Sequence, residues 1–130
     1  MSKTYKAALA EAMQEAMDSN PNSIIIGQGV TDFKGIFDTM IGFVDKYPDR
    51  IIETPLAEDS IAGICIGASL NGGYPINTHI RADFGLLIFN QLINLAAKYK
   101  YMFGGLFEVP SMYRMVIGRS WGQGAQHSQS

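Results

Sequence analysis

The sequence predicts an α/β domain with a mostly parallel central sheet and helices on both of its faces. Segments with helical periodicity alternate along the chain with short apolar segments that are typical of buried strands. The 130 residues are 47% hydrophobic and 17% charged. A chain of this length and composition can bury a core large enough for one compact domain.

The first helix and the first strand have clear signatures. Apolar side chains in residues 5–17 are spaced by three and one, which predicts an amphipathic helix that Thr4 can cap. Residues 23–27 form a β-branched run that ends in glycine, as expected for a strand buried on both faces. Residues 28–49 are rich in Gly, Asp and Phe and are predicted to form a long connection with one helical turn.

A second strand and a second helix follow. The strand is predicted over residues 50–54, and the helix over about 56–70 with Pro55 in its first turn. Gly63 and Gly67 lie one helical turn apart in this apolar helix. They are expected to let a neighbouring element approach closely.

The C-terminal half is predicted to add two strands and one helix. Residues 74–80 form a third strand candidate, and Asp83 is expected to cap a helix whose apolar face runs through residues 84–96. Residues 112–117 form the last strand, before the polar segment 118–130. Because no helix pattern follows this strand, we expect a fragment or a subunit that another chain completes.

Composition excludes several function classes. With 10 Lys+Arg against 12 Asp+Glu, the chain has no electrostatic footprint for nucleic acid. No apolar run reaches the roughly 18 residues of a membrane span, so no membrane association is predicted. Cys65 is the only cysteine and is expected to be a buried, inert thiol. We expect a soluble intracellular protein, cytoplasmic or, if the source is eukaryotic, in the mitochondrial matrix.

Local motifs alone do not identify a reaction. Gly27-Gln28-Gly29 lacks the third glycine of a dinucleotide fingerprint. His79 and His127 have no companion at metal-ligand spacing, so no metal site is predicted. Glu58 and Asp59 lie at the start of an apolar helix, where carboxylates also interact favourably with the helix dipole.

Three segments, taken together, resemble one family. They are Arg50-Ile51-Ile52-Glu53-Thr54-Pro55-Leu56-Ala57-Glu58, Gln91-Leu92-Ile93-Asn94-Leu95-Ala96-Ala97-Lys98 and Gln126-His127-Ser128-Gln129. In order and spacing they resemble the N-terminal, pyrimidine-binding domain of the beta subunit of thiamine-diphosphate-dependent 2-oxo acid dehydrogenases. The resemblance covers about residues 5–129 and implies a three-layer thiamine-diphosphate-binding fold. On this resemblance, residues 1–130 are expected to form a single domain, and the C-terminal domain of a full beta subunit is expected to be absent.

The resemblance implies roles for four side chains. Glu58 matches the catalytic glutamate that hydrogen-bonds a ring nitrogen of the cofactor's aminopyrimidine, which requires a hydrogen bond of about 2.6–3.2 Å. Phe84 matches the aromatic residue that stacks on the pyrimidine, although core packing explains it equally well. His127 matches the active-site histidine near the substrate and the incoming lipoyl group. Gln28 is expected at the cofactor, where the family usually has an acidic residue. Arg114 matches a family arginine and receives no catalytic role.

The implied reaction is decarboxylation of a 2-oxo acid with acyl transfer to lipoamide. Thiamine diphosphate is shared with an alpha-type subunit that binds the diphosphate and its Mg²⁺, and a lipoyl acyltransferase is a further partner. Self-association is also expected. Two alternatives stay open: ketol transfer by a split enzyme resembling transketolase or deoxyxylulose-phosphate synthase, and a non-catalytic subunit that keeps the fold for assembly.

Overall fold

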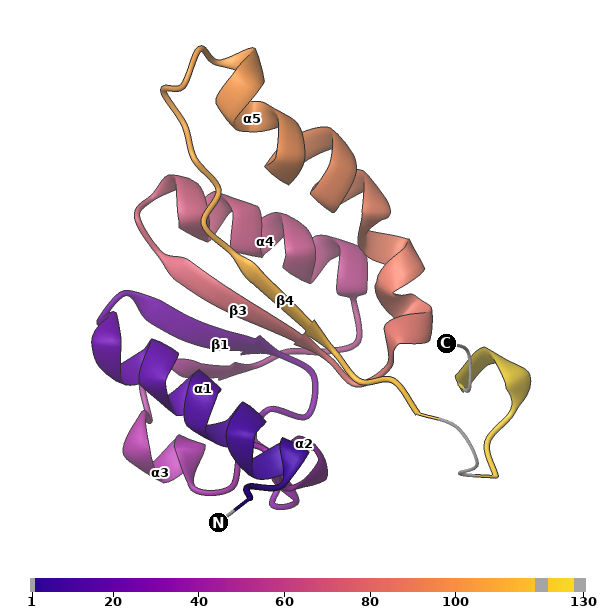
Figure 1. Ribbon diagram of the computed structural model, residues 1–130. Helices are drawn as coiled ribbons and strands as arrows, with labels where there is room; N and C mark the ends of the chain where they lie inside the picture. The colour runs from indigo at the N-terminus through magenta and orange to yellow at the C-terminus, as the bar shows by residue number, and fades with distance from the viewer. Residues whose placement is uncertain (1, 119–121, 128–130) are drawn as a thin grey trace.

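The computed structural model describes residues 2–118 and 122–127. Over these residues, four parallel strands form one sheet in the order β2-β1-β3-β4. Helices cover both faces of this sheet (Figure 1). The predicted α/β class, with a mostly parallel sheet between two helical layers, is confirmed. The strands are β1 (Ser23–Gly27), β2 (Ile51–Glu53), β3 (Tyr74–His79) and β4 (Met112–Met115).

The helical segments divide between the two layers. One layer holds α1 (Tyr5–Ser19), α2 (Gly35–Asp38) and α3 (Phe43–Lys46), and α4 (Glu58–Leu70) lies in the other. The 3₁₀ helix η1 (Ala82–Ile88), the π-helical η2 (Asn90–Ala96) and α5 (Ala97–Met102) follow one another beside α4. A 3₁₀ turn, η3 (Ala125–His127), comes last. None of the described helices is long and apolar enough to cross a membrane.

Alternate residues of β1 enter two hydrophobic cores. Ile25 packs in the core beneath α1 with Met17, and Ile26 packs in the core beneath α4 with Ile61 and Cys65. Such alternation is the period-two geometry of a strand, so β1 is buried on both faces as predicted. Burial raises the pKa of the Cys65 thiol to about 12, which agrees with the predicted buried thiol.

The start of α4 differs from the prediction. The helix begins at Glu58, after Ala57 as N-cap, so Pro55 lies before the helix instead of in its first turn. The backbone N–H of Thr54 donates to the carbonyl of Gly27 at 3.0 Å. This bond keeps the chain extended beside β1 past the end of β2, which delays the helix. Glu58 is therefore the first helical residue.

The predicted helix after β3 is interrupted, and Asp83 does not cap it. Arg81 is the N-cap of η1 and makes no side-chain capping bond, while Asp83 lies inside the first turn. The N–H of Ala82 donates to the carbonyl of Val116 at 2.9 Å, which ties this helix start to the chain after β4. Backbone pairing, not a side-chain cap, sets the boundary.

The connection after β1 contains two short helical segments, where one turn was expected. Ile36, Phe37 and Asp38 in α2 have positive φ angles of 44°, 56° and 63°. A β-branched residue such as Ile36 rarely adopts this left-handed conformation. Its buried side chain packs in the core beneath α1, and this packing holds the turn.

One side of α4 is open within this chain. In the described residues, no atom lies within 4 Å of the position that a Cβ would take at Gly63 or Gly67. The exposed side chains of Ile64 and Leu70 belong to the same helix. Among the described elements, none uses the close approach that the two glycines were predicted to allow.

Candidate functional site

A small pocket lies where β1, β2 and β3 end. The three strands are parallel, so their carboxyl ends meet at one edge of the sheet, which is where ligands bind in open α/β folds. The pocket has a volume of about 20 Å³. Residues that line it include Gly27, Gln28, Glu58, Ile61, Asn77 and His79.

Glu58 reaches this pocket because α4 begins immediately beside it. Its side chain is half-buried, whereas that of its neighbour Asp59 is exposed. The Asp59 carboxylate accepts a hydrogen bond of 2.7 Å from the N–H of Ser60 and so serves the local turn. The two carboxylates, which the sequence could not tell apart by position, therefore have different surroundings.

The loop that carries Gln28 is held by a carboxylate of β2. Glu53 accepts hydrogen bonds from the N–H of Gly29 at 2.6 Å and from the N–H and hydroxyl of Thr31 at 2.9 and 3.0 Å. These three bonds tie the loop after β1 to the end of β2. They fix the backbone beside Gln28, whose exposed side chain lines the same pocket as Glu58.

The end of β3 supplies the buried polar side of the pocket. Asn77 is 1% exposed and His79 is 5% exposed. Both amide atoms of Asn77 and Nε2 of His79 have no hydrogen-bond partner among the described residues. Burial lowers the pKa of His79, and the nearby negative charge of Glu58 acts in the opposite direction. Burial thus favours the neutral form of the His79 imidazole.

Phe84 and His127 form a second pair. Their rings meet edge to face, with centroids 5.3 Å apart and planes at 77°. The contact brings the start of η1 together with η3, two segments that are far apart in the sequence. No contact described in the structure joins this pair to Gln28 or Glu58. The last two residues of the motif, Ser128 and Gln129, lie outside the described residues.

The donor set of the strand-end pocket fits one part of the expected cofactor. A carboxylate, an amide and a neutral imidazole can hydrogen-bond the polar edge of an aminopyrimidine. No Lys or Arg is among the described residues that line the pocket, although such cations or a bound metal ion are common partners of a diphosphate. The described lining therefore offers hydrogen bonds to the polar edge of a pyrimidine and no cationic side chain for a diphosphate.

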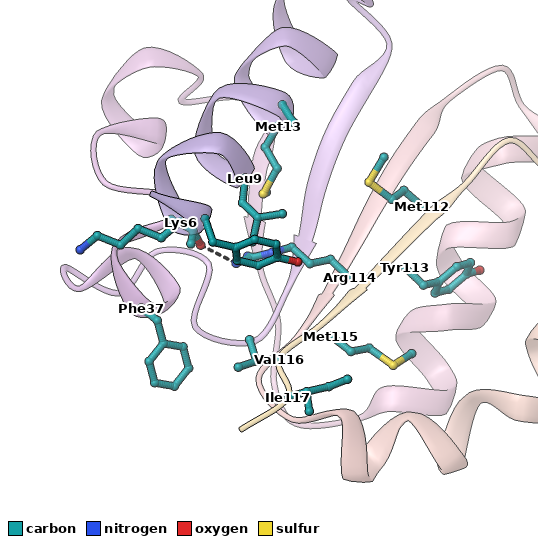
Figure 2. A pocket seen from close by; sticks show the side chains of 13 residues that line it. Lys6, Leu9, Met13, Phe37, Met112, Tyr113, Arg114, Met115, Val116 and Ile117 are labelled. Atoms are coloured by element: carbon teal, nitrogen blue, oxygen red, sulfur yellow. Dashed lines mark hydrogen bonds between the residues drawn. The ribbon is translucent and has the colours of Figure 1, made fainter. Parts of the chain in front are cut away.

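A larger groove lies on the other face of the sheet, between α1 and β4 (Figure 2). Its volume is about 640 Å³ and its lining is mostly apolar, with Leu9, Met13 and Met112 among the residues. Arg114 points into this side and donates to the Thr39 hydroxyl, whereas Tyr113 points to the opposite side of β4. The groove contains none of the predicted site residues, so its size does not make it the pyrimidine site.

The sequence did not predict three residues of this region: Asn77 and His79, which line the strand-end pocket, and Glu53, which holds the loop beside it. Glu53 was part of the quoted motif, but its contact with the loop depends on the pairing of β1 with β2. Asn77 and His79 were placed on a strand, and His79 was weighed only as a metal ligand. Two polar residues with period-two spacing at the end of a buried strand were the signal that could have found them.

Comparisons with known proteins agree with this geometry. The transketolase pyrimidine-binding domain family matches residues 1–129. The chain is 36% identical over 127 residues to the pyruvate dehydrogenase E1 component subunit beta-1 of Oryza sativa subsp. japonica, covering 97% of this chain and 34% of the relative. It is 38% identical to the corresponding mitochondrial subunit beta of Bos taurus, with 97% and 35% covered.

A third relative carries a different name. The acetoin:2,6-dichlorophenolindophenol oxidoreductase subunit beta of Cupriavidus necator is 34% identical over 136 residues, covering 97% of this chain and 40% of the relative. The chain thus spans between a third and two fifths of the length of these three proteins. The family match extends over nearly every residue, and the chain belongs to the transketolase pyrimidine-binding domain family.

Proposed function

We propose that this chain is the pyrimidine-binding domain of a thiamine-diphosphate-dependent enzyme that decarboxylates a 2-oxo acid and transfers the acyl group to lipoamide. The position of Glu58 carries the proposal: it is the first residue of α4, half-buried, and lines the strand-end pocket. Support also comes from the relatives, two of which are named as pyruvate dehydrogenase E1 beta subunits. The mitochondrial names of these two support a matrix location if the source is eukaryotic.

In this proposal Glu58 holds a proton at a ring nitrogen of the aminopyrimidine. When bound, thiamine diphosphate would supply an acidic thiazolium carbon and, in its aminopyrimidine, a nitrogen base for that carbon's proton. A carboxyl group at the ring nitrogen favours the tautomer that can accept that proton. The helix start fixes the Glu58 backbone, and the small volume of the pocket limits water around the carboxyl group.

The other predicted residues have distinct proposed roles. Gln28 contacts the cofactor from the loop that Glu53 holds. Phe84 stacks on the pyrimidine, and its edge-to-face contact with His127 orients the imidazole that serves the substrate and the lipoyl group. A Gln cannot carry or release a proton near pH 7, so Gln28 replaces an acidic group by a neutral hydrogen-bonding one.

The proposed enzyme needs a second chain. Since no cation is among the described residues that line the pocket, an alpha-type subunit supplies the binding site for the diphosphate and its Mg²⁺. A lipoyl acyltransferase component accepts the acyl group. The open side of α4 supports self-association or packing against a partner.

The test compares Glu58→Gln with Asp59→Asn in the complex of this chain with its alpha-type partner. Both variants remove one negative charge from the first turn of α4, so they lose the same dipole interaction, about 0.3–1 kcal/mol. Only Glu58→Gln is expected to lower turnover, by roughly 10²–10⁴-fold. Hydrogen–deuterium exchange at the thiazolium carbon should slow in parallel, because that step precedes contact with the 2-oxo acid.

Equal exchange and turnover in the two variants would exclude the catalytic role of Glu58 and favour the non-catalytic assembly subunit.

Substrate class is tested in the same complex with pyruvate, branched-chain 2-oxo acids, acetoin and a ketose phosphate. Turnover of the ketose alone would replace the dehydrogenase proposal by ketol transfer. Turnover of a 2-oxo acid with lipoamide as acceptor supports it.

A further inference from the structure

Asn77 and His79 face the same side of the sheet as α4. Asn77 pairs with Ile26 of β1, and Ile26 packs beneath α4 with Ile61. Side chains two residues apart in a strand share a face, so His79 points to that side as well. Thr78, between them, faces the α1 side together with Ile76.

Three side-chain atoms of these two residues lack hydrogen-bond partners in the described part of the chain. Both amide atoms of Asn77 and Nε2 of His79 have no hydrogen bond within the described residues, although both side chains are more than nine-tenths buried. Such buried atoms are rare in folded proteins, because each gives up its hydrogen bonds to water without gaining others. Three such atoms in one pocket indicate that a hydrogen-bonding ligand binds there.

The volume of the pocket limits which part of that ligand can enter it. About 20 Å³ holds a single small polar group, such as an amino group or a water molecule, and not an aromatic ring. A ring bound here must therefore insert only its polar edge. Its faces lie outside this pocket, where another chain can cover them.

We propose that Asn77 and His79 bind the polar edge of the cofactor's aminopyrimidine and form, with Glu58, the hydrogen-bonding site for that ring. The inference rests on the proposed function and adds two ligand-binding residues to it. Both are neutral groups: the amide of Asn77 donates and accepts, and the imidazole of His79 offers one donor or one acceptor at Nε2. Neutral partners match a neutral ring edge without burying an unpaired charge.

The proposal predicts opposite effects on stability and on binding. Replacing Asn77 or His79 by Leu removes an unpartnered polar group from a buried position, so the cofactor-free chain should unfold at a higher urea concentration. The same replacement should weaken binding of thiamine diphosphate, because each lost hydrogen bond lowers affinity by roughly tenfold. Replacing a side chain that only stabilises the fold would not raise the urea midpoint and weaken cofactor binding at the same time.

The experiment measures two quantities for each variant. Urea unfolding is followed for the full chain without cofactor, and the Kd of thiamine diphosphate with Mg²⁺ is measured by calorimetry for the complex with the alpha-type partner. Asn77→Leu and His79→Leu should raise the urea midpoint and raise Kd about tenfold. Thr78→Val is the comparison variant. Thr78 also borders the pocket, but strand alternation places its buried, unpartnered hydroxyl on the α1 side of β3, so only the urea midpoint should rise.

His79→Gln and Asn77→Ser keep a polar group and should recover part of the affinity, which guards against a Leu variant that misfolds. An unchanged Kd in both Leu variants would overturn this inference. If Glu58→Gln still slows thiazolium exchange in that case, the proposed function stands alone. If Glu58→Gln exchanges normally, the proposed function fails whatever the affinities are.

Discussion

At the scale of single residues, Glu53 shows how one carboxylate can organise a loop. Its two oxygens accept three hydrogen bonds from Gly29 and Thr31, at 2.6 to 3.0 Å. Bonds to an ionised acceptor are stronger than neutral ones, although exposure of Glu53 to water reduces the gain. The carboxylate therefore fixes the backbone on which Gln28 enters the pocket.

Glu53→Gln should destabilise this loop, because the amide keeps one acceptor and turns a donor toward another N–H. We expect the free energy of unfolding to fall by about 1 kcal/mol, measured by urea denaturation. Glu15→Gln, at an exposed position of α1, serves as control and should change stability by less than about 0.5 kcal/mol. Equal losses in the two variants would show that the Glu53 hydrogen bonds contribute nothing to stability.

The candidate site residues were predicted from the resemblance to a family, and their roles stay predictions. Gln28 and Glu58 were both expected at the cofactor, and the structure brings them into one pocket. His79 was missed because its importance depends on the pairing of β3 with β1, which buries it beside Glu58's helix. A lone histidine in a strand has no local feature that distinguishes a core residue from a ligand-binding one.

At the scale of elements, substitutions of the two glycines of α4 are expected to affect the stability of the chain and its self-association in opposite directions. Gly63 and Gly67 have open space where a Cβ would lie, and glycine inside a helix costs roughly 0.5–1 kcal/mol relative to alanine. Gly63→Ala and Gly67→Ala should each raise the free energy of unfolding by about that amount. Gly27→Ala should lower it, because its Cβ would overlap the carbonyl oxygen of Thr78.

If α4 packs closely against another subunit, the stabilised Gly67→Ala variant should nevertheless assemble less well. Light scattering of the full chain at micromolar concentration measures this. A loss of self-association together with a higher urea midpoint would support packing on α4. Unchanged self-association would place the contact elsewhere on the chain.

Elements with strong periodicity were predicted well, and their boundaries less so. The bounds of β1 were predicted correctly, and so was Thr4 as the N-cap of α1. The helix starts at Pro55 and Asp83 were wrong because backbone bonds to distant segments, from Thr54 to Gly27 and from Ala82 to Val116, set those boundaries. Capping rules see only local sequence and cannot include such bonds.

At the scale of the whole molecule, the charge and volume of the strand-end pocket decide what this chain can bind alone. The pocket has a volume of about 20 Å³, and its described lining includes no cationic side chain for a diphosphate. The chain carries a formal net charge of −2, which gives no overall attraction for a polyanion. Cofactor affinity should therefore come mainly from an assembled site.

The isolated chain should bind thiamine diphosphate weakly, with a Kd well above 1 µM even when Mg²⁺ is present. A Kd of 1 µM corresponds to about −8 kcal/mol, and a few hydrogen bonds to a ring edge supply far less, since each contributes about 1 kcal/mol in water. Titration calorimetry of the full chain measures this directly. Adding the alpha-type subunit should tighten binding, and Asn77→Leu should then weaken it again. Binding below 1 µM by the chain alone would mean that it holds the diphosphate itself, and the shared site would have to be abandoned.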